Sequence, residues 1–467
     1  MFYLHCAPDG FERVLAPYTS RDEAASGEGG PMQTNPMRRC LSVLGSLLAC
    51  FLIMSLVMVQ VRYLGYESGL IGVPRAEAAD MDAAPVDARS TIVAEYCSEV
   101  VSARDSVNSA GRTSTQLTFD DAWLHRDSRV YQHGLATACA VLSAVCNSES
   151  QYYSGVPGSI PYVEQTLGRL GFENVRTESY ALRSSIPDEV GSLLAGSSDV
   201  AAYALASKRL APDGGGQPAT LVFVGVRGTY GAEWLSNFNV LGRGQDPDHR
   251  GFKAAEEEVA QAVRAYVQES GLDPAHTRIL VTGHSRGGAI ANLLAADLSN
   301  PDEGEPALAP ASGIFAYTFA APCATRADNR TDAAFGNIFN VVNEADIVTQ
   351  LPLESWGYGR YGTTIELPSF ASDAFDDSYA VVQAAYRHNT GFALSADPDA
   401  LAALNAFGAN ASGHVPTAED LASPLGVFGI AQALLGLDVS AALNAHYPDT
   451  YIAWMQALGG DRPNAAA

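Results

Sequence analysis

A short apolar strand, a glycine-flanked turn and a helix follow one another directly around Ser285. The run ILVT leads into the pentapeptide GHSRG, residues 283–287, and an alanine-rich helical stretch begins immediately after it. A nucleophile on a tight strand-to-helix turn takes strained backbone angles, so small residues must flank it for the chain to pass close to itself. The helix that follows directs backbone N–H groups and its positive dipole end toward the serine. This order predicts that Ser285 is a nucleophile at the end of a sheet strand.

Strands and helices alternate on both sides of this turn. Apolar runs predict strands at 219–226, 278–282, 314–319 and 337–342, and helical spacing predicts helices at 131–145, 162–170, 252–267 and 288–298. Runs that are apolar on both faces belong in a parallel sheet that is covered on both sides. The sequence therefore predicts the α/β class, with a mostly parallel central sheet and helices on both faces.

An apolar segment from Leu41 to Val61 directly follows Arg38 and Arg39. It is long enough to span a bilayer as a helix, and the positive-inside tendency places the chain after Val61 outside the cytoplasm. The triplet Ala76-Glu77-Ala78 has the small-x-small pattern of a signal-peptidase site. A membrane anchor over residues 41–61 and secretion after cleavage near Ala78 both stay open, and both make the protein extracytoplasmic.

Composition divides the rest of the chain. Residues 1–36 form no recognisable element and are either disordered or a mis-assigned start before Met37, and residues 37–62 hold the export signal or anchor. Residues 63–118 are small and polar, which predicts a linker. Residues 119–467 form the predicted hydrolase domain, which is helical after Gly362. Within it the alanine-rich stretch 363–440 is a candidate helical cap insertion over the site.

Charge and cysteine usage restrict partners and cofactors. The net charge of -24 comes without a basic stretch, so nucleic acid is not expected as a partner. The cysteines after the apolar segment allow either disulfides or buried thiols; they are Cys97, Cys139, Cys146 and Cys323. None has the spacing of a metal site, and no cofactor or metal is expected.

A serine nucleophile needs a base to take its proton and an acid to orient that base, in the chain order Ser, acid, His. Asp346 follows the predicted strand 337–342 in a turn and is the predicted acid, with Glu344 as its rival. His446, at a loop-to-helix boundary, is the predicted base. His388 and His414 are predicted to be surface histidines.

The oxyanion of an acyl-transfer reaction needs two N–H donors. Arg286, the residue after the nucleophile, supplies one from its backbone. The turn Arg227-Gly228-Thr229 after the first long strand is the expected source of the other, and Thr229 can add its hydroxyl. Gly228 is expected to permit this turn.

Taken together, these motifs resemble the class 3, or fungal-lipase-like, family of α/β-hydrolases. The resemblance rests on the motifs VRGT with Glu233-Trp234-Leu235, Gly251-Phe252, VTGHSRGGAIANL, TFAAP and VVNEADIVTQLP. It covers about residues 221–352 and implies that Ser285, Asp346 and His446 form a catalytic triad, with Thr229 and Arg286 as oxyanion donors. The block 131–171 and the stretch LPLESWGYGRYG resemble the bacterial branch of that family.

The resemblance implies an exported serine hydrolase that cleaves carboxylic esters, with lipid-like esters as substrates. Arg286 departs from the apolar residue that many lipases carry after the nucleophile, and its guanidinium could favour an anionic head group. Thioesterase, phospholipase or peptidase activity on the same triad remains an alternative. A surface binding module without activity is a further alternative.

Overall fold

The computed structural model describes residues 88–108, 110–148, 161–178, 201–211, 218–228, 247–301, 304–369, 373–394, 398–417, 420 and 444–459. The predicted membrane segment 41–61, the predicted oxyanion residue Thr229 and residues 421–443 lie outside this set. No helix within the described residues is both long and apolar enough to cross a membrane.

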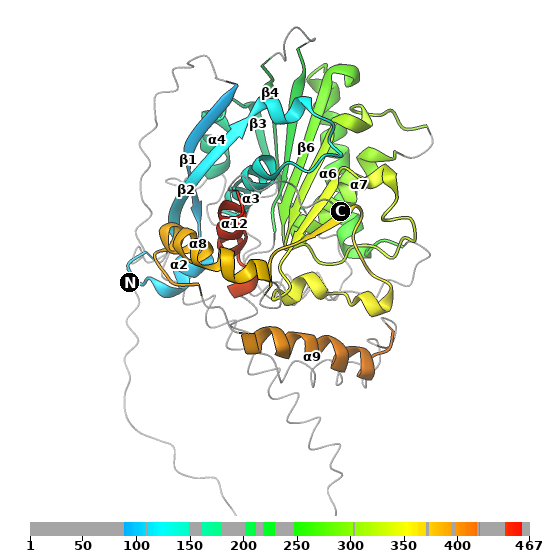
Figure 1. Ribbon diagram of the computed structural model, residues 1–467. Coiled ribbons are helices and arrows are strands. Elements are labelled where there is room, and N and C mark those ends of the chain that lie inside the picture. Colours follow the sequence, from blue (N-terminus) through cyan, green and yellow to red (C-terminus); the bar gives the residue numbers. More distant parts are fainter. Residues whose placement is uncertain are drawn as a thin grey trace, which may run out of the picture. The chain divides into compact units, whose positions relative to one another are not determined.

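Seven strands form the central sheet, and their spatial order follows the chain (Figure 1). They are β3 (Glu173–Glu178), β4 (Tyr203–Arg209), β5 (Thr220–Val226), β6 (Thr277–His284), β7 (Ile314–Phe319), β8 (Ile338–Val342) and β9 (Thr363–Glu366). Strands β5 to β9 run parallel, whereas β3 and β4 pair antiparallel. The four strands predicted from the sequence are β5 to β8, and the mostly parallel sheet is confirmed.

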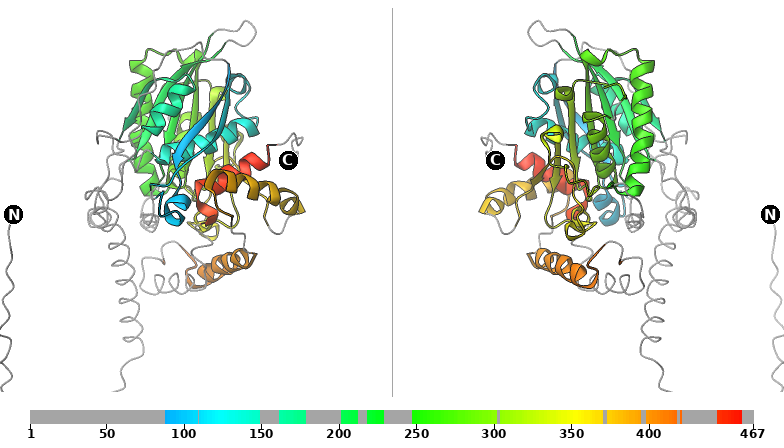
Figure 2. Two further views of the ribbon diagram at one scale, coloured as in Figure 1. Left: turned by 90° about the vertical axis from the view of Figure 1, so that its left-hand side faces the viewer. Right: turned by 90° about the vertical axis from the view of Figure 1, so that its right-hand side faces the viewer.

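Helices cover both faces of this sheet (Figures 1 and 2). On one face lie α6 (Arg250–Glu269) and α7 (Arg286–Ser299); the core on the other face includes α3 (His133–Ser148), α4 (Tyr162–Arg169), α8 (Asp373–Thr390) and α12 (Pro448–Ala457). Strand alternation divides the two cores, because Leu221 and Phe223 join one while Val222 and Val224 join the other. This is the doubly covered sheet expected of an α/β-hydrolase.

A two-stranded hairpin precedes the main sheet, and it corrects the predicted linker. Strands β1 (Arg89–Cys97) and β2 (Arg112–Asp120) pair antiparallel, with the short helix α2 (Glu99–Arg104) between them. The prediction of a linker over residues 63–118 is therefore wrong from Arg89 onward. In β2, small polar residues alternate with the few apolar ones that face the core, so its composition looks like that of a linker, although pairing with β1 stabilises it as a strand.

The hairpin is bonded to the last helix of the described chain. Asp449, in the first turn of α12, is buried and accepts hydrogen bonds on both carboxylate oxygens. Tyr96 Oη donates to Oδ1 at 2.8 Å and Ser98 Oγ donates to Oδ2 at 2.8 Å. The hairpin is thus part of the same packed core as α12.

The region after Gly362 is not wholly helical as predicted. It first adds the parallel edge strand β9, and only then do α8 and α9 (Pro398–His414) follow. Helix α9 packs Leu404, Phe407 and Ala411 against the apolar residues around Ile347 and Leu351. The role of residues 363–440 as a cap stays a prediction.

The sequence left disulfides and buried thiols open for the four cysteines after the apolar segment. Cys97, Cys139, Cys146 and Cys323 are all buried, and none of these four forms a disulfide. Burial raises the pKa of the Cys323 thiol, which keeps it protonated. Buried thiols, rather than disulfides, therefore describe this part of the chain.

Candidate active site

Ser285 occupies a sharp turn between β6 and α7. Its backbone has φ 58° and ψ -130°, a conformation that residues with a side chain rarely adopt. Its N–H donates to the carbonyl oxygen of Phe319 at 2.9 Å, which ties the turn to the end of β7. Such strain persists where the surrounding structure holds it, and it is typical of functional residues.

The glycines around the turn are required by close backbone approach. A Cβ added at Gly283 would overlap the carbonyl oxygen of Gly287, and one added at Gly287 would overlap the carbonyl oxygen of Val226. At Gly228 a Cβ would lie 2.6 Å from the carbonyl oxygen of His284. The backbone after β5 and the start of α7 therefore pass too close for any larger residue.

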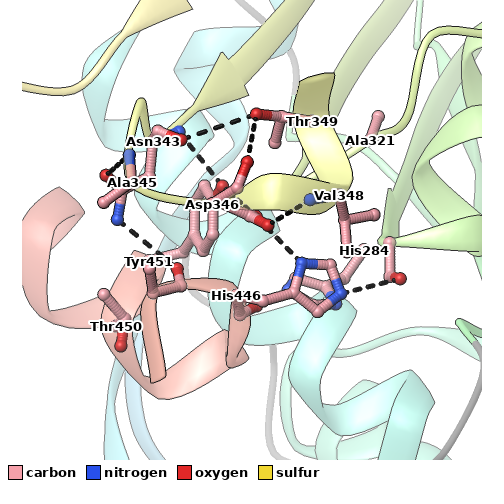
Figure 3. Close-up of polar contacts among 12 residues, drawn as sticks. His284, Ala321, Asn343, Ala345, Asp346, Val348, Thr349, His446, Thr450 and Tyr451 are labelled. Atoms are coloured by element: carbon pink, nitrogen blue, oxygen red, sulfur yellow. Dashed lines mark hydrogen bonds and ion pairs between the residues drawn. The ribbon is translucent and has the colours of Figure 1, made fainter. Parts of the chain in front are cut away.

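The three predicted triad residues meet beside the carboxyl ends of β6 and β8. Figure 3 shows His446 next to Asp346. His446 Nε2 lies 2.9 Å from Ser285 Oγ, and His446 Nδ1 lies 2.8 Å from Asp346 Oδ2. All three are buried, with exposed fractions of 3% for Ser285, 8% for His446 and 0% for Asp346. These side chains come from three separate elements, namely the turn after β6, the turn after β8 and the segment before α12.

Asp346 is held by donors other than His446. The backbone N–H of Val348 donates to Oδ1 at 2.9 Å, and the hydroxyl of Tyr451 donates to Oδ2 at 2.8 Å. Burial, and then the negative charge of Asp346, raise the pKa of Tyr451 well above its ordinary value, so its hydroxyl remains a donor. Tyr451 was missed from the sequence, since nothing before folding relates α12 to the turn after β8.

The alternative acid and the other two histidines that follow Asp346 do not take part in the triad contacts. Glu344 is half-buried, and it is Asp346, not Glu344, that is bonded to His446. His388 is exposed in the last turn of α8. His414 is exposed at the end of α9, where its Nδ1 bonds to the carbonyl oxygen of Asn410 at 2.8 Å.

One of the two predicted oxyanion donors is described. Arg286 is the first residue of α7, so its backbone N–H lies in the first turn, where such groups point out of the helix end. Gly228 donates its own N–H to Asn147 Oδ1 at 2.7 Å, which fixes the turn that leads to Thr229. Thr229 itself lies outside the described residues.

Over the described ranges, no group of three or more His, Cys, Asp and Glu side chains is arranged to hold a metal ion. The arrangement instead supports a proton transfer from Ser285 to His446, with Asp346 as the buried partner of the imidazole.

Sequence comparisons find similarity to lipases. Residues 223–356 match the sequence model of the family described as lipase (class 3). A lipase of Rhizomucor miehei is 34% identical over 122 residues, which is 24% of this chain and 31% of that protein. The secreted mono- and diacylglycerol lipase 1 of Fusarium solani is 33% identical over 151 residues, which is 29% of this chain and 41% of that protein. The matches thus span less than half the length of each relative.

Solved structures give a weaker likeness. One, of a triacylglycerol lipase with a serine protease triad as its catalytic centre, is 19% identical with a TM-score of 0.33, covering 49% of this chain and 79% of that chain. Lipase II from Rhizopus niveus is 18% identical with a TM-score of 0.33, covering 50% of this chain and 81% of that chain. Scores this low carry no argument about function.

Proposed function

We propose that this protein is a serine hydrolase of the class 3 lipase type that cleaves carboxylic esters, with lipid-like esters as its substrates. The observation that carries the proposal is the hydrogen-bonded series from Ser285 through His446 to Asp346, with distances of 2.9 and 2.8 Å. It lies at a strained strand-to-helix turn, where a serine oxygen can reach a substrate.

The reaction is acyl transfer through a covalent intermediate. Ser285 Oγ attacks the ester carbonyl carbon while its proton passes to His446 Nε2, and Asp346 stabilises the imidazolium that forms. The bond to the alcohol then breaks, and His446 gives the proton to the leaving oxygen. Water then attacks the carbonyl carbon of the acyl-enzyme while His446 Nε2 takes a proton from it. The bond between the acyl carbon and Ser285 Oγ breaks, the acid leaves, and His446 returns the proton to Ser285 Oγ.

The oxyanion of each tetrahedral intermediate is assigned to the backbone N–H of Arg286 and to Thr229. The start of α7 supports this role, because the positive end of a helix dipole favours a developing negative charge.

Lipid-like esters are proposed from the relatives. One is named a lipase, and the other is named a secreted mono- and diacylglycerol lipase, so acylglycerols are the first substrates to test. Two features of the sequence also belong to the proposal: export by residues 37–62, with either an anchor at 41–61 or cleavage near Ala78, and a helical cap over residues 363–440. The stretch LPLESWGYGRYG supports a place in the bacterial branch of the family.

The test is labelling with a fluorophosphonate probe, together with turnover of p-nitrophenyl esters of increasing acyl length. We expect the wild-type chain to be labelled and active, and Ser285→Ala to lose both, with turnover falling by about 10⁴-fold or more because the nucleophile is absent. Ser106→Ala removes an exposed serine in the turn after α2 and serves as the matched control. It should keep full labelling and turnover.

The outcomes separate the alternatives. Turnover that survives in Ser285→Ala contradicts the proposal, and a wild-type chain that is neither labelled nor active indicates a binding module. A thioester, a phospholipid and a peptide substrate tested alongside the esters distinguish other acyl-transfer activities, since the triad is shared and the substrate is selected elsewhere.

A further inference from the structure

His284 precedes the nucleophile in the chain, yet its side chain is directed at the histidine of the site. Its Nε2 lies 2.8 Å from the backbone carbonyl oxygen of His446. A carbonyl oxygen can only accept, so Nε2 carries the proton and donates. The imidazole is buried, with 3% of His284 exposed, so this bond is sheltered from water.

Strand geometry explains why the residue at this position can reach His446. Side chains alternate along β6, so Leu280, Thr282 and His284 share one face of the sheet. Leu280 belongs to the core that contains α3 and α12, and Thr282 donates to the carbonyl oxygen of Tyr317 at 2.9 Å. His284 is therefore held on the α12 side of the sheet, whereas the turn that follows directs Ser285 toward the ring of His446.

A hydrogen bond to the carbonyl oxygen of His446 restricts the position of its backbone. His446 is the last residue of the helical stretch described over residues 444–446, and α12 begins at Pro448, so the carbonyl group of His446 lies at the break between the two. Its ring must contact Ser285 and Asp346 at the same time, and a displacement of about 1 Å can lower an enzyme's rate by about 10²-fold. A bond at the carbonyl fixes the backbone from which the ring projects.

The charge state of His284 suits this role. Burial, and then the proximity of His446, hold the pKa of His284 well below its ordinary value, so the ring is neutral near pH 7. The centroids of the two rings are 5.0 Å apart. A neutral ring can hold the backbone without opposing the positive charge that forms on His446 during the reaction.

We propose that His284 is a positioning residue, which holds the backbone of His446 so that the His446 ring bridges Ser285 and Asp346. This inference rests on the proposed ester hydrolysis. His284 is the second residue of the GHSRG pentapeptide, and in this role it affects catalysis without contacting the substrate.

The test compares two polar substitutions that differ in reach. The amide nitrogen of glutamine can take the place of histidine Nε2, whereas the shorter asparagine ends near the position of Nδ1. We expect His284→Gln to keep kcat within about threefold of the wild type and His284→Asn to lose at least tenfold, with KM changed less than twofold in both. Rates are divided by the number of sites that a fluorophosphonate probe titrates, so unfolded protein does not count.

A matched control removes a similar bond from a histidine to a backbone carbonyl oxygen, in this case one of α12. His133 Nε2 contacts the carbonyl oxygen of Met455, near the far end of α12, at 2.7 Å. His133→Asn should lower the melting temperature and leave kcat per titrated site unchanged.

Equal kcat values per titrated site in His284→Asn and His284→Gln would overturn the role, because reach to the carbonyl would then be irrelevant. A fall in kcat for His133→Asn as large as that for His284→Asn would also overturn it, since it would indicate a general effect of loosening α12. If the wild-type chain is itself neither labelled nor active, it is the proposed hydrolysis that fails, and the role of His284 fails with it.

Discussion

The hydroxyl of Tyr451 and the imidazole of His446 both bond to the same oxygen of Asp346. Tyr451 Oη lies 2.8 Å from Oδ2, and His446 Nδ1 also lies 2.8 Å from it. Tyr451 Oη in turn accepts the backbone N–H of Asn343 at 3.1 Å. One side chain of α12 thereby fixes both the carboxylate and the turn that carries it.

Tyr451→Phe should therefore impair turnover more than substrate binding. Loss of one donor leaves Oδ2 less constrained, and we expect kcat to fall by about 3- to 10-fold with KM nearly unchanged. The free energy of unfolding should fall by about 1 kcal/mol, the usual net contribution of one buried hydrogen bond.

Tyr96→Phe is the matched control for that substitution, since Tyr96 donates to another buried aspartate, Asp449, also at 2.8 Å. It should lose similar stability but keep kcat. A kcat that falls equally in both variants, measured per titrated site, would contradict a specific role for Tyr451.

Asp346→Asn should nearly abolish turnover although the shape of the side chain is preserved. An amide in this place disfavours the tautomer of His446 that can accept the proton from Ser285, and the expected fall in kcat is about 10³- to 10⁴-fold. Glu344→Gln, at the half-buried rival position, should stay within about twofold of the wild type. Ester turnover by the purified variants measures both, and the reverse ranking would make Glu344 the acid.

Gly287→Ala should destabilise the fold. The added methyl group would overlap the carbonyl oxygen of Val226, and overpacking of this kind costs about 1–3 kcal/mol. Gly413→Ala in α9 is the control, because a Cβ there meets nothing within 4 Å and alanine favours a helix by about 0.5–1 kcal/mol. Urea unfolding measures both, and a Gly287→Ala variant as stable as the wild type would contradict the tight packing of the turn.

Stability should depend on the ionisation of Glu256 in α6. Burial raises the pKa of this carboxyl from 4.5 to about 7, although Nζ of Lys253 lies 2.8 Å from Oε2. The folded state therefore keeps a proton that the unfolded chain has lost between these pH values. The contribution of Glu256 to the free energy of unfolding therefore falls as pH rises from about 4.5 to about 7, and it does not change further above that range.

Glu256→Gln removes this dependence. The two proteins should be equally stable near pH 4, and the variant should be the more stable by up to about 3 kcal/mol at pH 8, since each pKa unit corresponds to about 1.4 kcal/mol. Urea unfolding at several pH values measures the difference. Glu257→Gln, at the exposed neighbouring residue, should follow the wild type. A constant difference between Glu256→Gln and the wild type would show that Glu256 titrates normally.

The sequence predicted the elements whose own residues carry the signal. The strands β5 to β8 are nearly continuous apolar runs, and α3, α4, α6 and α7 have helical apolar spacing, so local pattern and burial agree. Ser285 and Asp346 were predicted in the same way, because each follows a predicted strand at the end where a crevice forms. His446 was predicted instead from the chain order Ser, acid, His and from its place at a loop-to-helix boundary.

The missed elements depend on partners far away in the chain. Strand β4 reads YALASKR, and its Lys208 is buried only because Asp121, from a distant part of the sequence, pairs with it at 2.7 Å. Strand β9 is short and half-polar and is defined by its pairing with β8. Tyr451 and His284 belong to this group, since Tyr451 contacts Asp346 and His284 contacts His446, each across a large distance in sequence.

The bond between the first hairpin and the last described helix has a consequence for biosynthesis. Ser285 and Asp346 are both translated before α12, and α12 closes on Tyr96 and Ser98, which were made much earlier. A nascent chain that has not yet reached His446 holds the nucleophile without its base. On the proposed function, the chain can hydrolyse lipids only late in its synthesis. An incomplete chain therefore cannot hydrolyse the membrane lipids of the cell that makes it.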